Sequence, residues 1–232
     1  MAGDVLVHER PVTKPGTVVP DDVAVRLRSP DSPYVSRGGE KLAGALDAFG
    51  IAVRDLVTLD VGASTGGFTD CLLQRGARRV VALDVGYGQL AWTLRRDPRV
   101  VVLERTNART LTAAMLPERP RLAVVDVSFI SLATVLRAIA SVVEPGGSIV
   151  ALVKPQFEVG RGRVGKGGVV RDPAARAGAV AKVRTAAEAL GLGVRGEVES
   201  VLSGPKGNRE VFLWLAGGQP GAPAAPSPRG PG

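Results

Sequence analysis

Leu59-Asp60-Val61-Gly62-Ala63-Ser64-Thr65-Gly66-Gly67-Phe68 is the stretch that decides the fold of this chain. The apolar run 55–59 predicts a buried strand that leads into it, and residues 69–75 predict the first turns of a helix after it. A strand, a glycine turn and a helix in this order open the ligand-binding units of α/β proteins. A Cβ on any of the three glycines is expected to occupy ligand space, so the backbone is predicted to pass close to a ligand.

Three kinds of ligand are compatible with a glycine turn of this type. A phosphate-binding P-loop needs a lysine after its last glycine, and Phe68 stands there instead. A dinucleotide fingerprint needs G-x-G-x-x-G, and Ser64 takes the place of its second glycine. The pattern that remains, D-x-G-x-x-x-G-G, is the form used for S-adenosylmethionine, whose carboxylate can accept from backbone N–H groups and from the hydroxyls of Ser64 and Thr65. The alternative is a tight turn that binds no ligand.

The next two predicted strands also end in polar residues. Asp84 ends the strand 79–84, where a carboxylate can accept hydrogen bonds from both hydroxyls of an adenosine ribose. A helix cap or a surface charge is the alternative for Asp84. Asn107 follows the strand 100–104, where a side-chain amide can read the edge of an adenine ring, and a turn residue is an equally good interpretation.

Two further predicted strands end in charged residues. Asp126 lies near the end of the strand 122–129 and is expected to face the same crevice as Asp84, because ligands bind outside the carboxyl ends of open parallel sheets. Lys154 ends the strand that begins at Ser148. An ammonium group is costly to bury without a partner, and burial lowers the pKa of a lysine, so Lys154 is predicted to be functional.

A helix is predicted to begin near Ser36, which is expected to cap it. Lys41 lies near the start of this helix, where its charge opposes the helix dipole. A residue placed against local preference invites a functional explanation, and a solvated lysine is the simpler one.

The composition is that of an ordinary globular chain, and its 232 residues suffice for one domain with a full core. The formal net charge of +8 favours an anionic partner such as RNA. The only cysteine is Cys71, so the sequence excludes a disulfide framework and a cysteine-rich zinc cluster. The N-terminus lacks the apolar core of a signal peptide, and the most apolar region is interrupted by charges, so the expected compartment is the cytoplasm.

Three segments lie outside this α/β pattern. Residues 1–30 predict a small β element that resembles the last part of an S4 RNA-binding module, and we interpret them as a remnant of such a module. Residues 159–171 are basic and contain five glycines, which favours either a disordered loop or a mobile rim that contacts phosphates. Residues 217–232 are rich in glycine, proline and alanine and are expected to be disordered.

Four motifs together resemble the TlyA (haemolysin A) family, at residues 36–42, 60–70, 125–131 and 153–158. The resemblance implies an FtsJ-like domain over 31–216 with the Rossmann-like class I methyltransferase fold. This is an α/β fold with a mostly parallel seven-stranded sheet and an antiparallel terminal strand. It also implies S-adenosyl-L-methionine as cofactor and methylation of ribose 2′-hydroxyls, of cytidine, in ribosomal RNA. Ribosomal subunits are then the expected partners, with no metal and no stable membrane association.

The resemblance also implies roles for individual residues. The catalytic tetrad of the FtsJ-like proteins matches Lys41, Asp126, Lys154 and Glu210. Lys154, desolvated and near a second cation, is expected to have a lowered pKa and to take the hydroxyl proton. The residues expected to bind the cofactor are Asp60, Gly62, Ser64, Thr65, Gly66, Gly67, Phe68, Asp84, Asn107 and Asp126. The residues expected to bind RNA are Arg37, Arg161, Arg163 and Lys166.

Two other classes of function remain open at this point. An NAD(P)-dependent oxidoreductase shares the predicted sheet but needs a different glycine spacing. An RNA-binding or haemolysin-type protein without catalytic activity needs neither the tetrad nor the cofactor. The absence of a basic amphipathic helix with a large apolar face argues against direct membrane lysis.

Overall fold

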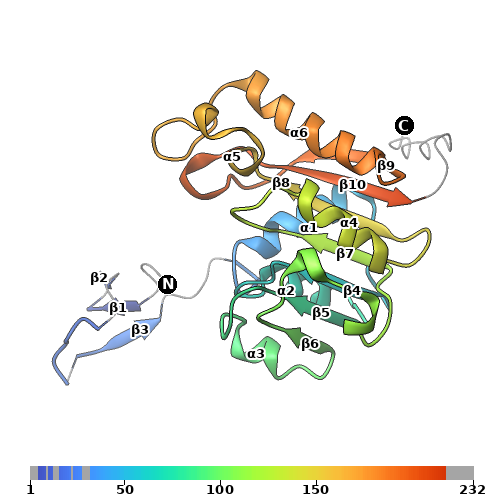
Figure 1. The fold of residues 1–232 in the computed structure, drawn as a ribbon. Helices are drawn as coiled ribbons and strands as arrows, with labels where there is room; N and C mark the ends of the chain where they lie inside the picture. The colour runs from blue at the N-terminus through green and yellow to red at the C-terminus, as the bar shows by residue number, and fades with distance from the viewer. Residues whose placement is uncertain (1–4, 9, 13–15, 22, 28–31, 218–232) are drawn as a thin grey trace, which may run out of the picture.

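The computed structural model describes residues 5–217, apart from residues 9, 13–15, 22 and 28–31. The predicted disordered tail therefore lies outside the described residues, except for Gly217, which ends the last strand. The described residues form two separate sheets, of three and seven strands (Figure 1).

The small sheet is built from the N-terminal segment. It is antiparallel, and its order is β2-β1-β3, with β1 at Val5–Val7, β2 at Arg10–Val12 and β3 at Val25–Leu27. The expected small β element is confirmed.

The large sheet has the order β6-β5-β4-β7-β8-β10-β9. Strands β4 to β8 run parallel to one another, whereas β10 is inserted antiparallel between β8 and β9. The predicted mostly parallel seven-stranded sheet with an antiparallel terminal strand is confirmed. Its strands are β4 (Val57–Val61), β5 (Arg79–Leu83), β6 (Val100–Leu103), β7 (Leu122–Val125), β8 (Ser148–Val153), β9 (Leu192–Glu199) and β10 (Val211–Gly217).

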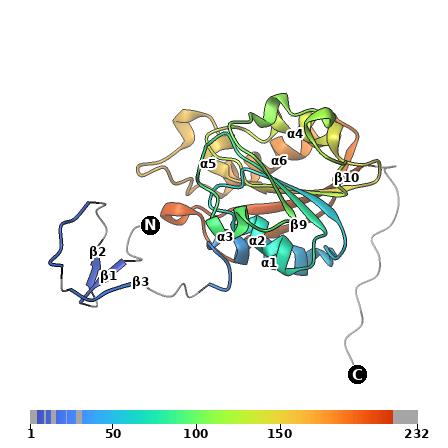
Figure 2. The same cartoon turned by 90° about the horizontal axis from the view of Figure 1, so that it is seen from below.

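Helices cover both faces of this sheet, as Figure 2 shows. Helices α1 (Gly38–Phe49), α2 (Gly67–Gln74) and α3 (Trp92–Arg95) lie on one face. Helices α4 (Ala133–Val142) and α6 (Pro173–Glu188) lie on the other. The short helices are α5 (Pro155–Glu158), η1 (Ala108–Thr110), η2 (Ala113–Met115), η3 (Arg161–Arg163) and η4 (Pro205–Gly207).

Both faces of the central strands are apolar, which explains the near-continuous hydrophobic runs in the sequence. Successive residues of one strand point to opposite faces, so Leu152 packs with α1 and α2 while Val153 packs with α4 and α6. Both side chains are almost completely buried. Because apolar side chains cover both faces of the large sheet, the polar residues lie at the ends of its strands.

Two local predictions are wrong. Ser36 does not cap α1, because the helix begins at Gly38 without a side-chain cap and the carbonyl of Ser36 bonds to the N–H of Gly39. The strand predicted over 122–129 ends four residues early, as β7.

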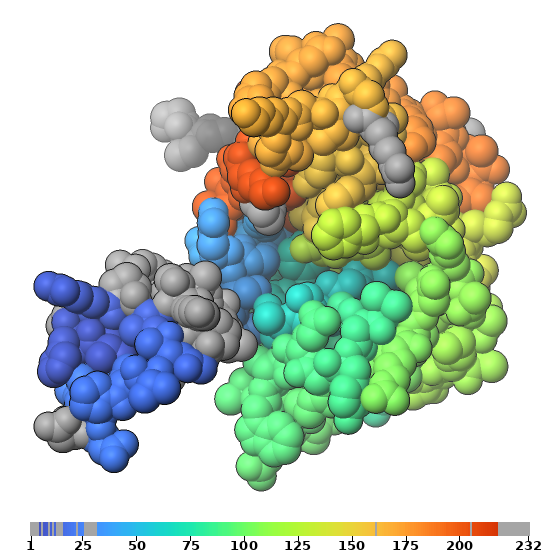
Figure 3. Space-filling model, turned by 60° about the vertical axis from the view of Figure 1, so that its left-hand side comes forward, coloured from blue at the N-terminus to red at the C-terminus, as the bar shows by residue number. Residues whose placement is uncertain are grey.

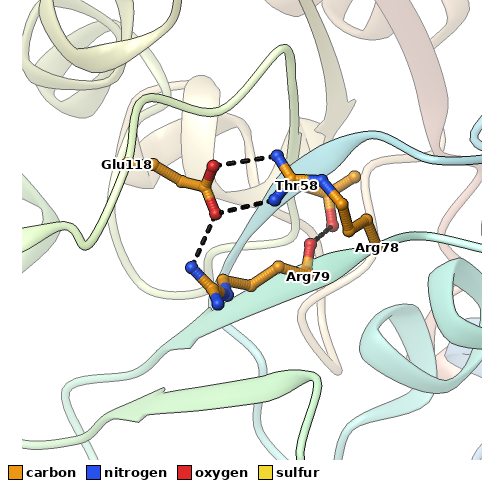
Figure 4. Close-up of polar contacts among 4 residues, drawn as sticks. All are labelled: Thr58, Arg78, Arg79 and Glu118. Carbon is orange, nitrogen blue, oxygen red and sulfur yellow. Dashed lines mark hydrogen bonds and ion pairs between the residues drawn. The ribbon is translucent and has the colours of Figure 1, made fainter.

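Glu118 forms ion pairs at the amino edge of the sheet, opposite the polar strand ends (Figure 4). Its carboxylate pairs with Arg78 at 2.8 Å and with Arg79 at 2.6 Å, and hydrogen bonding to Arg78 holds the pKa of Glu118 below its usual value. The Thr58 hydroxyl donates to the carbonyl of Arg79 at 3.1 Å. Because these ion pairs are partly exposed, we expect them to contribute little to stability.

Candidate active site

The carboxyl ends of β4, β5, β7 and β8 meet at one edge of the large sheet. The surface is hollowed there, between the green segment that follows β5 and the yellow-green and orange segments that follow β7 and β8 (Figure 3). This is the edge where open parallel sheets bind ligands.

The three glycines of the turn after β4 are required by the protein's own packing. A Cβ on Gly62, where φ is +88°, would lie 2.5 Å from the carbonyl oxygen of Asp126. On Gly66, where φ is +100°, it would lie 2.3 Å from the side chain of Leu94, and on Gly67 it would lie 2.2 Å from the Ser36 hydroxyl. The prediction that these Cβ atoms would occupy ligand space is wrong, because neighbouring segments fill that space.

Asp84 shapes the turn from the end of the next strand. Its two carboxylate oxygens accept the N–H groups of Ser64 at 2.8 Å and Gly86 at 2.7 Å. These bonds hold Ser64 in a left-handed conformation with φ at +49°, and Ser64 and Thr65 remain exposed. Each carboxylate oxygen has a second lone pair, so Asp84 can still accept hydroxyl groups of a ribose.

Phe68 and Asn107, which were predicted to bind the cofactor, both have contacts within the protein. Phe68 is only 3% exposed and packs 6.1 Å from the ring of Phe212, so the structure places it in the core. Asn107 is exposed, and its side-chain oxygen accepts the N–H of Arg109 and caps η1. The turn interpretation of Asn107 is the one that has a contact in the structure.

Asp60 is a fully buried carboxyl group beneath the turn. One of its oxygens accepts the hydroxyl of Thr69 at 2.7 Å, and the other has no hydrogen-bond partner. Burial, with smaller contributions from the charges of Asp126 and Asp84, raises the pKa of Asp60 to about 7. An orphaned buried acceptor at this position fits a ligand that carries a hydrogen-bond donor or a positive charge.

Asp60 gives a testable pH dependence of stability. Because its pKa is higher in the folded than in the unfolded protein, the unfolding free energy should fall as the pH rises from about 4 to about 7. Asp60→Asn keeps an acceptor for Thr69 and removes the titration of the buried carboxyl group. The variant should therefore be more stable than wild type at pH 8, by an amount on the order of 2–4 kcal/mol. Urea unfolding at pH 4.5 and pH 8 checks this; a pH-independent difference between the two proteins would contradict it.

The first ion pair of the site joins α1 to the residue before β10. The ammonium group of Lys41 lies 2.6 Å from Oε2 of Glu210, and the side chains are 10% and 0% exposed. The second carboxylate oxygen of Glu210 has no hydrogen-bond partner. Lys41 is therefore not the solvated lysine of the simpler interpretation.

The second ion pair joins the ends of β7 and β8. Nζ of Lys154 lies 2.5 Å from Oδ1 of Asp126 and donates a hydrogen bond to the hydroxyl of Ser128 at 2.9 Å. The contact with Oδ1 is close but does not have hydrogen-bond alignment, whereas the contact with Ser128 does. Ser128 thus has a place in the site that sequence reasoning missed.

Strand register brings the two ion pairs to the same end of the sheet. Val211 of β10 pairs with Val153 of β8, so Glu210 and Lys154 occupy the next position on adjacent strands. All four residues of the predicted tetrad therefore lie at one edge. In the structure each lysine is paired with its own carboxylate, Lys41 with Glu210 and Lys154 with Asp126.

Phe129 is an exposed aromatic residue beside Ser128. It is 91% exposed, has a left-handed backbone with φ at +64°, and lies 5.1 Å from the ring of Phe157. A large exposed aromatic residue next to a charged site provides a flat surface for a nucleobase. Its position after the Asp126-Val127-Ser128 motif is a signal that the sequence contains.

The predicted RNA-binding residues lie in two segments, before α1 and after α5. Arg37 precedes α1 and is exposed, as are Arg163 and Lys166 in the glycine-rich loop after α5. Arg161 begins η3, and its side chain lies outside the described residues.

Asn208 fastens this loop to the segment that leads into Glu210. Its side chain is buried, accepts the N–H of Val170 at 3.0 Å and donates to the carbonyl of Gly168 at 2.9 Å. Two segments about 40 residues apart in sequence are thus joined next to the Lys41–Glu210 pair. Sequence reasoning missed Asn208, because a turn asparagine does not reveal a distant partner.

Within the described residues there is no group of three or more histidine, cysteine or acidic residues that could hold a metal ion. Among those same residues, no helix combines the length and the apolar character that crossing a membrane requires.

Comparisons with known proteins agree with this geometry. A model of the FtsJ-like methyltransferase family matches residues 34–217. The chain is 56% identical over 215 residues to the 16S/23S rRNA (cytidine-2′-O)-methyltransferase TlyA of Mycobacterium tuberculosis, which covers 92% of this chain and 80% of that protein.

Solved structures are similar as well. The solved structure of a candidate hemolysin from Streptococcus thermophilus has a TM-score of 0.81 and 42% identity, and the match covers 93% of this chain and 79% of the other. An S-adenosylmethionine dependent methyltransferase from Mesorhizobium loti has a TM-score of 0.52 at 16% identity, over 75% of this chain and 96% of its own. At that identity the similarity shows the fold alone.

Proposed function

Because this chain belongs to the FtsJ-like methyltransferase family, we propose that it transfers a methyl group from S-adenosylmethionine to ribose 2′-hydroxyls, those of cytidine, in ribosomal RNA. The observation that carries the proposal is the placement of two lysine–carboxylate pairs at the sheet edge that also holds the glycine turn and Asp84. The fold is the Rossmann-like methyltransferase fold.

The residues present fit the cofactor. Asp84 offers acceptors for the ribose, Ser64 and Thr65 offer exposed hydroxyls, and the orphaned oxygen of Asp60 offers an acceptor for a donor or a cation. When bound, S-adenosylmethionine supplies the methyl group from its sulfonium, whose sulfur is a good leaving group. This family relationship does not support the oxidoreductase alternative.

We assign the proton transfer to Lys154. A ribose hydroxyl is a poor nucleophile and needs a base or strong polarisation near its oxygen. In this proposal the nitrogen of Lys154 accepts the hydroxyl proton, while Asp126 and Ser128 fix its position. Glu210 holds Lys41, whose ammonium polarises the substrate. Positioning of the hydroxyl oxygen in line with the methyl group contributes much of the remaining rate acceleration.

We assign RNA binding to the rim of the hollow. Arg37 is an exposed cation just before the helix that carries Lys41, Arg163 and Lys166 are exposed cations in the loop after α5, and Phe129 offers a stacking surface for a base. Residues 1–30, which contain the small antiparallel sheet, belong in this proposal to an S4-like RNA-binding module, and residues 31–216 form the methyltransferase domain.

Incubating the purified chain with ribosomal subunits and tritiated S-adenosylmethionine tests the function. We expect label in ribosomal RNA, and mapping of alkali-resistant linkages should place it on ribose 2′-oxygens. Label on a base, or no label in either subunit, would contradict the proposal.

Asp84→Ala should weaken cofactor binding by about 1–3 kcal/mol, because the ribose loses its acceptors and the N–H groups of Ser64 and Gly86 lose theirs. Calorimetry with the intact protein and the variant measures the difference. Glu188→Ala is the matched control, since it removes an exposed acid at the end of α6. Equal affinity in wild type and Asp84→Ala would remove Asp84 from the cofactor site.

Replacing Arg163 and Lys166 with glutamine should lower the slope of log affinity for RNA against log salt by about 1–2 units, because fewer phosphate counterions are released. The control replaces Arg119 and Arg121 with glutamine, two exposed arginines just before β7, at the opposite edge of the sheet. A slope that falls equally in both double variants would show a general charge effect and no role for the loop.

A further inference from the structure

Glu158 is a buried carboxylate to which the proposed reaction assigns no role. It ends α5, the single-turn helix that starts directly after Lys154, and it is 6% exposed. Its Oε1 accepts the N–H of Leu132 at 2.7 Å, and its Oε2 accepts the hydroxyl of Ser131 at 2.6 Å. Both donors belong to the segment that leads from β7 into α4, which is the segment that carries Asp126 and Ser128.

Lys182 of α6 balances the charge of Glu158 from the other side. Its ammonium lies 3.2 Å from Oε2 and donates to the backbone carbonyl of Glu158 at 3.0 Å. The Lys182 side chain is 49% exposed, so it can form this pair or turn to solvent at little cost. The two contacts that define the position of the carboxylate are therefore those with Ser131 and Leu132.

These contacts also complete the start of α4. Leu132 is its N-cap residue, and Glu158 accepts the N–H of Leu132 from a distant segment. A negative charge is favoured at this end of a helix. A buried carboxylate costs desolvation energy, whereas an apolar residue would fill the space at lower cost. Unlike an apolar side chain, the carboxylate of Glu158 fixes the distance between α5 and the segment that leads into α4.

Together with the backbone, these contacts form a closed loop of covalent and hydrogen bonds around the ammonium group of Lys154. On one side the chain runs from Lys154 through α5 to Glu158. On the other it runs from Asp126, whose N–H bonds to the carbonyl of Val61, to Leu132, whose N–H bonds to Glu158. Ser128 lies between those two anchors and accepts from Nζ of Lys154.

We propose that Glu158 is a positioning residue for methyl transfer: it holds residues 126–132 against the turn after β8, so that Asp126 and Ser128 stay on the Lys154 nitrogen. The inference rests on the proposed function, because it assigns Glu158 a role through Lys154. Without the two hydrogen bonds to Glu158, the segment that carries Ser128 keeps the packing of Leu132 in the core but loses its polar link to the turn after β8. The cofactor contacts of Asp84 lie on another strand and do not depend on this link.

Three variants test the proposal. Glu158→Leu removes both acceptors and should lower kcat by about 10²-fold with unchanged cofactor affinity, because catalysis is sensitive to misplacement of about 1 Å. Glu158→Gln can accept from Leu132 and donate to Ser131, so it should restore kcat to within about threefold of wild type. Lys182→Met, the control, should stay within about twofold, because its contact is half exposed. A kcat for Glu158→Leu equal to wild type, or Glu158→Gln as damaging as Glu158→Leu, overturns the proposal.

A readout without RNA separates this inference from the proposed function. The backbone amide of Leu132 should exchange with deuterium faster in Glu158→Leu than in wild type or Lys182→Met, and the amides of Asp84 and Gly86 should not change. In the Ser128→Ala background the effect of Glu158→Leu on kcat should shrink, because both act on the same contact. Wild type that fails to label ribosomal RNA refutes the function; active wild type with full additivity of the two variants refutes the positioning role.

Discussion

Replacing Lys154 with methionine is expected to lower the rate of methyl transfer by about 10²–10⁴-fold, the usual cost of losing a general base. The lysine ends a buried central strand, its side chain is 11% exposed, and its nitrogen is fixed by Asp126 and Ser128. Methionine keeps much of the length and apolar stem of lysine and removes the amine. Cofactor affinity should remain, because the glycine turn and Asp84 lie on β4 and β5.

Lys154→Arg distinguishes a base from a fixed positive charge. A guanidinium keeps the charge and does not lose its proton in the working pH range, so this variant should be nearly as inactive as Lys154→Met. Single-turnover transfer of tritiated methyl groups to ribosomal subunits, alongside calorimetry with the cofactor, measures both variants. Near-normal turnover in Lys154→Arg would mean that Lys154 supplies charge only and that the proton leaves to another acceptor.

Gly204→Ala is the second change with a large expected effect. A Cβ at this position would lie 2.1 Å from Oε1 and 2.6 Å from Cδ of Glu210, whose side chain is completely buried. The backbone at Gly204, with φ at −65° and ψ at 173°, suits alanine, so the conflict is purely steric. Glu210 must move away, and Lys41 then loses its buried partner. Disrupting a buried pair in this way should cost about 3 kcal/mol of stability and most of the activity.

Gly178→Ala is the matched control for this prediction. It places the same methyl group in the interior of α6, where no atom lies within 4 Å of the added Cβ. Since alanine favours helix, this variant should be neutral or more stable by up to about 1 kcal/mol. Urea unfolding and kcat are measured for both proteins. A Gly204→Ala midpoint equal to that of the control would show that Glu210 has room to shift without consequence.

The sequence predicted the fold well because its determinants are local. Buried parallel strands appear as apolar runs, and the glycine turn after β4 stands at a fixed place relative to Asp84 and Asp126. Strand ends also gave the positions of Asp126 and Lys154. The family resemblance added Glu210 and a role for Lys41, which periodicity alone would have left in solvent.

Contacts between distant segments could not be predicted in the same way. Asn208 is joined to residues about 40 positions away, and Glu158 is 26 positions from Leu132, so no local pattern marks either one. The reason for the glycines was also hidden, because Gly62 faces the backbone of Asp126 only once β4 and β7 are paired. The burial of Phe68 could not be predicted for a related reason: its neighbour Phe212 lies on β10, far away in sequence.

The position of β10 in the sheet has a consequence for how the protein is made. Within the described residues, β9 pairs only with β10, so β9 has no place in the sheet until β10 has been made. The pairing of β10 with β8 connects segments that lie far apart in sequence, and such pairing is slow to form, because the loop must close before any contact repays it. Glu210 immediately precedes β10, and Lys41 lies 169 positions earlier. The parallel strands β4 to β8 can therefore pair before β10 is made, whereas the Lys41–Glu210 pair cannot form until the segment that leads into β10 has been made.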